Sequence, residues 1–172
     1  MTGKVTLRPV QDSDDDFLLK VYGSTREQEM AQVPWTSEQK QQFVRMQWEA
    51  QKSHYAAQHP QACHEIICLE GDVAGRLYLD RSGEKFHILD ITLLPEHRNR
   101  GAGSFLLYQI MAEAKEAGKP VTIYVETFNP SLRLFQRLGL HAHPARGFSP
   151  AAAVRGLSRQ INFTLARPAK LF

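Results

Sequence analysis

The feature that most restricts the fold is a strand, a glycine-containing loop and a helix that follow one another without a linker. Residues 86–94 are mostly apolar, as in a buried strand, and Pro95 closes the stretch. The loop sequence RNRGAG follows at residues 98–103, and apolar residues then recur at helical spacing as far as Ala114. Gly118 suits the left-handed position after a helix end. We therefore predict a strand–loop–helix unit over this part of the chain.

The rest of the chain alternates between helical and strand patterns. An acidic helix start lies at Asp12, and Thr36 with Gln39 forms a capping box for a second helix. Further strands are predicted at residues 5–8, 66–69, 73–80, 121–126 and 161–165, and residues 141–156 read as irregular. The order β-α-α-β-β-β-α-β-α-β-β predicts one α+β domain over residues 1–172, with a single mixed, mostly antiparallel sheet and helices on both faces.

Composition narrows the class of protein. At 172 residues, with 42% hydrophobic and 23% charged residues, the chain suits one globular domain. No apolar stretch approaches the roughly 20 residues that cross a bilayer, and the acidic N-terminal segment lacks a secretory signal. The net charge of +3 is mild, and the basic residues are not interleaved with aromatic ones. We therefore expect a cytoplasmic protein with neither a membrane nor a nucleic-acid partner.

The two cysteines, Cys63 and Cys68, lie in an apolar alternating stretch. A disulfide, a metal site and a reactive thiol are alternatives, but buried free thiols are the reading that a reducing compartment favours. The neighbouring sequence HEIIC misses the H-E-x-x-H zinc signature and falls on a predicted strand. We therefore expect no metal.

The loop at residues 98–103 has the features of an anion site. Backbone N–H groups at the start of a helix have no partner within the helix, and the helix dipole favours negative charge there. Gly101 and Gly103 let the backbone approach an anion closely, while Arg98 and Arg100 can bind phosphate oxygens. Neither the G-x-G-x-x-G fingerprint nor the G-x-x-x-x-G-K-[ST] phosphate loop fits, because Leu106 takes the third glycine position and no Lys-Ser/Thr pair follows.

What remains is R-x-x-G-x-G between a strand and a helix, which resembles the pyrophosphate-binding motif of the GNAT superfamily of acyl-CoA-dependent acyltransferases. Residues 129–140, NPSLRLFQRLGL, resemble the second motif of that family. The resemblance is strong from about residue 89 to 140. It implies the GNAT acyltransferase fold, with acetyl-CoA as co-substrate and its pantetheine arm between the splayed strands at residues 86–94 and 121–126. The cofactor-binding residues implied are Leu93, Leu94, Arg98, Asn99, Arg100, Gly101, Ala102, Gly103, Ser104, Asn129 and Phe135.

Attack on a thioester requires a neutral amine, so a base must take its proton. Members of this family often carry the base on the third meander strand or the next strand, where the candidates are His87, Asp90 and Glu126. Asp90 interrupts an apolar run and needs a partner, which could be a substrate ammonium. A salt-bridged or solvated strand residue is the alternative for each of the three. The family's usual tyrosine acid is replaced by Phe135, which cannot donate a proton.

The segment between the first two helices is the expected acceptor side. Glu27, Glu29 and Trp35 could hold a cation by charge and cation–π contact, and a surface charge cluster with a core tryptophan is the alternative. The resemblance implies an N-acetyltransferase that acts on an amine of a small molecule or peptide by direct attack in a ternary complex. Acylation of a hydroxyl, and a non-catalytic acyl-CoA-binding sensor or interaction module, are the alternatives. Dimers are common among members of this family, so the resemblance is compatible with a homodimer.

Overall fold

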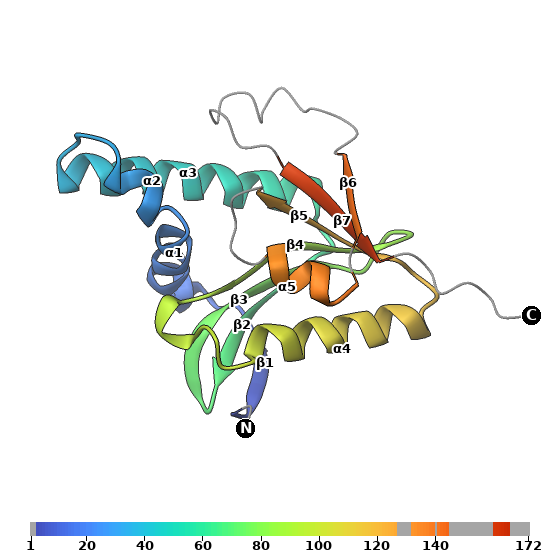
Figure 1. Cartoon of the computed structure of the whole chain (residues 1–172). Coiled ribbons are helices and arrows are strands. Elements are labelled where there is room, and N and C mark those ends of the chain that lie inside the picture. Colours follow the sequence, from blue (N-terminus) through green and yellow to red (C-terminus); the bar gives the residue numbers. More distant parts are fainter. Residues whose placement is uncertain (1–2, 127–131, 140, 145–159, 166–172) are drawn as a thin grey trace, which may run out of the picture. The chain divides into compact units, whose positions relative to one another are not determined.

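The computed structural model describes residues 3–126, 132–139, 141–144 and 160–165 (Figure 1). The chain divides into two compact units, each treated by itself below. The first unit comprises Met1–Leu79 with Asp90–Phe105, and the second comprises Asp80–Leu89 with Leu106–Phe172. The prediction of one domain over residues 1–172 stays a prediction.

The elements follow the predicted order, which confirms the α+β class. The strands are β1 (Val5–Pro9), β2 (Cys63–Leu69), β3 (Asp72–Asp80), β4 (Phe86–Leu93), β5 (Val121–Glu126), β6 (His141–Pro144) and β7 (Gln160–Leu165). The helices are α1 (Asp15–Ser24), α2 (Glu27–Ala31), α3 (Ser37–Gln58), α4 (Ala102–Glu116) and α5 (Leu132–Arg137), and single 3₁₀ turns cover Asp12–Asp14 and Pro95–His97. Strand β6 corrects the irregular reading of residues 141–156, and the short helix α2 was not predicted. No helix among these residues is long and apolar enough to cross a membrane.

In the first unit, β1, β2 and β3 form an antiparallel meander. The register pairs Val5 with Leu69 across β1 and β2, and Cys63 with Leu79 across β2 and β3. The C-terminal end of β4 lies beside β3, because the Leu94 backbone N–H donates to the carbonyl of Ala74 at 2.9 Å. This arrangement confirms the predicted meander.

Helix α3 begins as its sequence predicts. The Thr36 hydroxyl accepts from the backbone N–H of Gln39 at 3.2 Å, and the Gln39 side chain accepts from the backbone N–H of Thr36 at 3.0 Å. These two bonds form the capping box and satisfy donors that the helix itself leaves without partners. The helix runs for 22 residues and buries Trp48 and Gln51.

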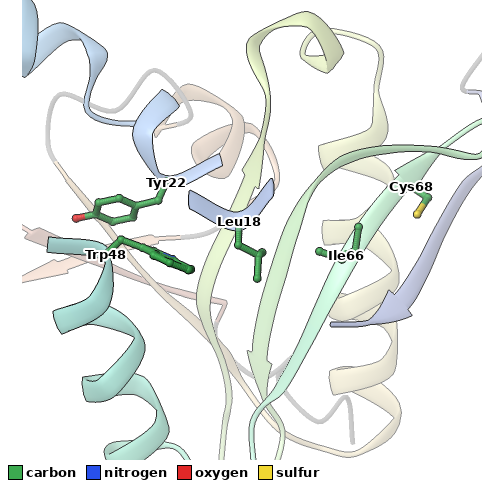
Figure 2. Packing of buried hydrophobic residues seen from close by; sticks show 5 residues of the cluster. All are labelled: Leu18, Tyr22, Trp48, Ile66 and Cys68. Atoms are coloured by element: carbon green, nitrogen blue, oxygen red, sulfur yellow. The ribbon is translucent and has the colours of Figure 1, made fainter. Parts of the chain in front are cut away.

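A hydrophobic cluster fixes helices α1 and α3 against the meander. Figure 2 shows Leu18 and Tyr22 from α1 and Trp48 from α3 beside Ile66 and Cys68 from β2. Burial of each large apolar side chain stabilises the folded state by about 1.5–3 kcal/mol. Both cysteines are free, but Cys63, at the first residue of β2, is exposed, so the prediction of buried thiols holds for Cys68 alone.

In the second unit, the first half of β4 runs parallel to β5, and β5, β7 and β6 follow as antiparallel neighbours. Gly118 has a φ of 67° directly after α4, which confirms the predicted helix end. Arg81 binds Glu113 of α4 through two hydrogen bonds, from Nε at 2.7 Å and from Nη2 at 3.1 Å. The mixed, mostly antiparallel pairing agrees with the predicted sheet.

Candidate functional site

The loop between β4 and α4 folds into a tight series of turns. The His97 backbone N–H donates to the carbonyl of Leu94 at 2.9 Å, and that of Arg98 donates to the carbonyl of Pro95 at 3.2 Å. Asn99 and Gly101 then have φ angles of 59° and 81°, in the left-handed region that glycine and asparagine adopt most readily. These turns lead the chain directly into the first turn of α4, whose backbone N–H groups need partners from outside the helix.

The start of α4 is anchored on one side and open on the other. Ala102 is buried in a small apolar cluster with Leu69 and Ala74, against which Leu93 packs. A Cβ added at Gly103 would meet the Leu93 side chain at 3.9 Å, an ordinary contact, and no other described atom within 4 Å. The first turn of α4 therefore has room for a ligand at Gly103, and the predicted cofactor-binding residues Leu93–Ser104 lie along this one stretch.

Two arginines supply positive charge at this loop. The Arg98 Nε donates to the carbonyl of Leu93 at 2.8 Å, which ties the side chain across the base of the loop. Arg100 is exposed. Neither arginine forms an ion pair with another residue in the described part of the chain, so both guanidinium groups remain available to an anion. The geometry fits a phosphate ester bound at the N-terminus of a helix of 15 residues.

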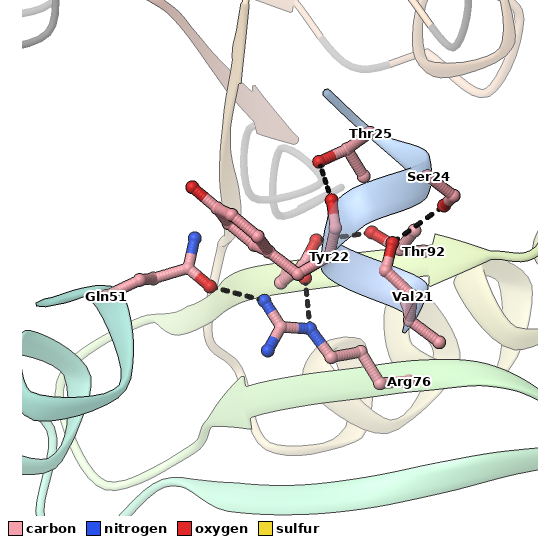
Figure 3. A network of polar contacts seen from close by, with 8 residues as sticks. Val21, Tyr22, Ser24, Thr25, Gln51, Arg76 and Thr92 are labelled. Atoms are coloured by element: carbon pink, nitrogen blue, oxygen red, sulfur yellow. Dashed lines mark hydrogen bonds and ion pairs between the residues drawn. The ribbon is translucent and has the colours of Figure 1, made fainter. Parts of the chain in front are cut away.

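The predicted base Asp90 already has a cationic partner inside the protein. The Nε of Arg76, from β3, donates to Asp90 Oδ2 at 2.5 Å, and Thr92 Oγ1 donates to Asp90 Oδ1 at 2.7 Å. The Arg76 side chain also reaches Gln51 of α3 at 2.5 Å, as Figure 3 shows. Sequence reasoning missed Arg76, although a charged residue inside an apolar strand signals a buried partner. The carboxylate is therefore paired without any substrate ammonium.

His87 is buried, with 7% of its surface exposed. Its Nδ1 lies 2.8 Å from Thr122 Oγ1 on the neighbouring strand β5, and the Thr122 hydroxyl donates to the carbonyl of Phe86 at 3.4 Å. The imidazole tautomer decides whether Nδ1 donates to the Thr122 hydroxyl or accepts from it. Glu126 is the last residue of β5 and pairs with Gln160 of β7, and its side chain lies outside the described part.

Within the second unit, β4 pairs with β5 in parallel, with Phe86 opposite Val121, His87 opposite Thr122 and Ile88 opposite Ile123. Phe135 of α5, predicted from the sequence to stand in place of the family's tyrosine, is buried, with 3% of its surface exposed. Asn129 lies outside the described residues.

The three predicted acceptor-binding residues differ in their contacts and exposure. Glu29 forms an ion pair with Arg26 at 3.0 Å, and Glu27 is exposed on α2. Trp35 is 40% exposed and contacts the edge of Phe43, with 5.2 Å between ring centroids. Trp35 is therefore not the core residue of the alternative reading. In the described part of the chain, no three His, Cys, Asp or Glu side chains are grouped as a metal site requires.

Comparison with known proteins gives a consistent result. The model of the acetyltransferase (GNAT) family matches residues 25–140. Solved structures with the same fold include a PaiA N-acetyltransferase from Thermoplasma acidophilum in complex with coenzyme A, with a TM-score of 0.66 at 15% identity, over 94% of this chain and 98% of that one. The ribosomal-protein-S18-alanine N-acetyltransferase from Escherichia coli gives a TM-score of 0.62 at 14% identity, over 98% and 99% of the two chains. An acetyltransferase from Thermus thermophilus gives 0.63 at 16% identity, over 95% and 97%. No curated protein matches the sequence.

Proposed function

The chain belongs to the acetyltransferase (GNAT) family, and we propose that it transfers the acetyl group of acetyl-CoA to an amine of a small molecule or peptide. The observation that carries this proposal is the loop before α4. Its backbone turns at Asn99 and Gly101, its open position at Gly103 and its two arginines together suit a pyrophosphate. Coenzyme A in the Thermoplasma acidophilum structure supports the same ligand here.

The co-substrate would bind along one stretch of chain. Backbone N–H groups of residues 102–104, with Arg98 and Arg100, would hold the pyrophosphate. The pantetheine arm would lie along the part of β4 from Asp90 to Leu93, which leads into this loop. The acetyl group would then lie near the middle of β4, close to Asp90. Acetyl-CoA supplies the activated acyl group, and the protein binds and orients it.

In the transfer step, the amine nitrogen attacks the thioester carbonyl carbon, so a C–N bond forms, the C–S bond breaks and coenzyme A leaves as the thiolate. One proton must leave the amine nitrogen. Asp90 is poorly suited as the base, because both of its oxygens already accept hydrogen bonds. His87 is buried against Thr122, so Glu126 or water is the better candidate. Phe135 has no proton to give, so the thiolate either takes a proton from water or another group, or leaves unprotonated.

The acceptor class proposed is an amine. The Escherichia coli protein with the same fold is named for transfer to an alanine of a ribosomal protein, which supports an amine in preference to a hydroxyl. Exposed Glu27 and Trp35 remain the proposed contacts for a cationic acceptor. Cytoplasmic location and a homodimer stay predictions.

The test is release of free thiol from acetyl-CoA in the presence of polyamines, amino acids, aminoglycosides and peptides with free N-termini. We expect thiol release with at least one of these classes, together with a mass increase of the acceptor by one acetyl group. Tight acetyl-CoA binding with no turnover on any amine would instead favour the sensor. Thiol release with a hydroxyl acceptor alone would overturn the choice of amine.

The cofactor site has its own test. Gly103→Val should abolish acetyl-CoA binding and leave the domain folded, because the added side chain enters open space rather than the core. Gly83→Val is the matched control, since a Cβ at this exposed turn has no described atom closer than 4.0 Å and lies outside the loop. Retained acetyl-CoA affinity in folded Gly103→Val protein would contradict the assignment of the site.

A further inference from the structure

Arg76 is the most deeply buried charged side chain in the described part of the chain. Only 3% of its surface is exposed. Its Nη2 donates to Gln51 of α3, as Figure 3 shows. Its Nε donates to Asp90 of β4, so one guanidinium joins β3, β4 and α3. A charge taken out of water is stabilised only when its partners are placed well. The position of Arg76 therefore depends on Asp90, and the position of Asp90 depends on Arg76.

The same stretch of β4 is tied to β3 by its backbone. The Leu94 N–H donates to the Ala74 carbonyl at 2.9 Å. Gly75 lies so close to Thr92 that a Cβ there would overlap the Thr92 carbonyl. Strand β3 thus supports β4 from Asp90 to Leu94, immediately before the loop that carries Arg98.

The Arg76–Asp90 pair lies at the upstream end of this supported stretch. The loop that carries Arg98 and Arg100 begins after Leu94, at the downstream end of the same stretch. In the proposed function, the acetyl group lies near Asp90 and the phosphates lie at the loop. A side chain that fixes β4 at Asp90 therefore acts at the acetyl end of the co-substrate.

We propose that Arg76 is a positioning residue that acts through Asp90 to hold the part of β4 that binds the acetyl group. This inference rests on the proposed function. The ion pair occupies the Asp90 carboxylate, so Asp90 serves to fix the backbone and does not take the amine proton. Arg76 supports recognition of the acetyl group, and the loop at residues 98–104 supports recognition of the phosphates.

The experiment compares the affinities for acetyl-CoA and for CoA by isothermal titration calorimetry. The main variant is the double change Arg76→Gln with Asp90→Asn, which leaves no unpaired buried charge. We expect its acetyl-CoA affinity to fall by about five-fold, the equivalent of one backbone hydrogen bond, and its CoA affinity to change by less than about two-fold. The milder Thr92→Val change removes the hydroxyl that binds Asp90 Oδ1 and keeps the side-chain shape. It should shift the same ratio in the same direction by a smaller factor.

Two further variants separate positioning from general stability. Arg76→Lys keeps the charge but lacks the planar fork that binds both partners, so its acetyl-CoA affinity should lie between those of wild type and the double variant. Arg81→Gln removes another arginine–carboxylate pair, with Glu113, in the second unit and should leave both affinities unchanged. Circular dichroism and thermal unfolding establish that each variant is folded.

The possible results are distinct. An equal loss of acetyl-CoA and CoA affinity, or no loss of either in the double variant and in Thr92→Val, would overturn this inference and leave the proposed function standing. Failure of the wild-type protein to bind either ligand would overturn the proposed function and this inference together. A selective loss of acetyl-CoA affinity supports this inference, and thiol release decides the proposed function separately.

Discussion

The junction between β1 and α1 allows a quantitative prediction of stability. Arg8 donates from Nη1 and Nη2 to the two oxygens of Asp14, each at 2.8 Å, and the Gln11 backbone N–H donates to Asp14 Oδ2 at 2.8 Å. These bonds lower the pKa of Asp14 from 3.8 to about 2, and those from Arg8 have the largest effect. Burial acts in the opposite direction. Asp14 is 7% exposed. The ionised carboxylate is therefore favoured by the folded state.

The size of the effect follows from this pKa difference. Each pKa unit corresponds to about 1.4 kcal/mol, so the shift amounts to about 2–3 kcal/mol at neutral pH. Because the Arg8 side chain is partly exposed and its charge is screened by solvent, we expect Asp14→Asn to cost about 1–2 kcal/mol at pH 7. A lowered folded-state pKa stabilises the protein above the unfolded pKa of 3.8, and this stability is lost as pH falls through about 2. At pH 3 the difference between wild type and variant should be about half of that at pH 7.

Urea unfolding of wild type and Asp14→Asn at pH 7 and pH 3 measures both quantities. Asp15→Asn is the matched control, because Asp15 forms an exposed ion pair with Lys52 at 3.2 Å, and such pairs contribute about 0–1 kcal/mol. The reasoning is refuted if the two variants lose the same stability at pH 7. It is also refuted if the cost of Asp14→Asn does not shrink at pH 3.

Three further variants test other parts of the chain. Gly75→Ala should destabilise the fold by about 2–3 kcal/mol in urea unfolding, because its Cβ would overlap the β4 backbone, and a neutral effect would contradict the close approach of the strands. Burial, and then the charge of Arg76, lower the pKa of His64 from 6.5 to about 4, so the folded state favours the neutral imidazole and loses stability as pH falls from 6.5 toward 4. As pH falls from 7.5 to 5, the free energy of unfolding of His64→Phe should therefore rise by about 1–2 kcal/mol relative to that of wild type. Parallel curves of stability against pH for the two proteins would refute this. Phe135→Tyr adds the hydroxyl of the family's proton donor and should raise the acetylation rate on the order of 10-fold, whereas a slower enzyme would show that the buried position rejects a hydroxyl.

Local signals explain what the sequence could predict. The capping box of Thr36 and Gln39 and the glycine at position 118 act within a few residues, so their structural outcome depends little on the rest of the fold. The loop at residues 98–103 is also a local signal, because its glycines and arginines all lie between one strand and one helix. The α+β order was predictable for the same reason.

Contacts between distant parts of the chain explain what was missed. Asp90 could be recognised as a carboxylate that needs a partner, but its pairing with Arg76 depends on the side-by-side placement of β3 and β4. Similarly, β6 gains its strand structure by pairing with β7, from His141 opposite Thr164 to Pro144 opposite Ile161, and has no alternating pattern of its own. The roles of His87 and Glu126 stay predictions.

The hydrogen bond from Arg98 to the Leu93 carbonyl lowers the entropy cost of binding an anion at the loop. This bond restrains the rotamers of a long side chain while the site is still empty, so the loss of conformational entropy occurs during folding and not during binding. The planar guanidinium can keep this bond through Nε and still present its outer N–H groups to phosphate oxygens. A lysine at the same position would have to bind the carbonyl and the anion through one nitrogen, without the planar fork that separates the two tasks. The loop is therefore preorganised by the same side chain that supplies its charge, and the pairing of these two properties gives a physical reason for arginine at this point in the motif.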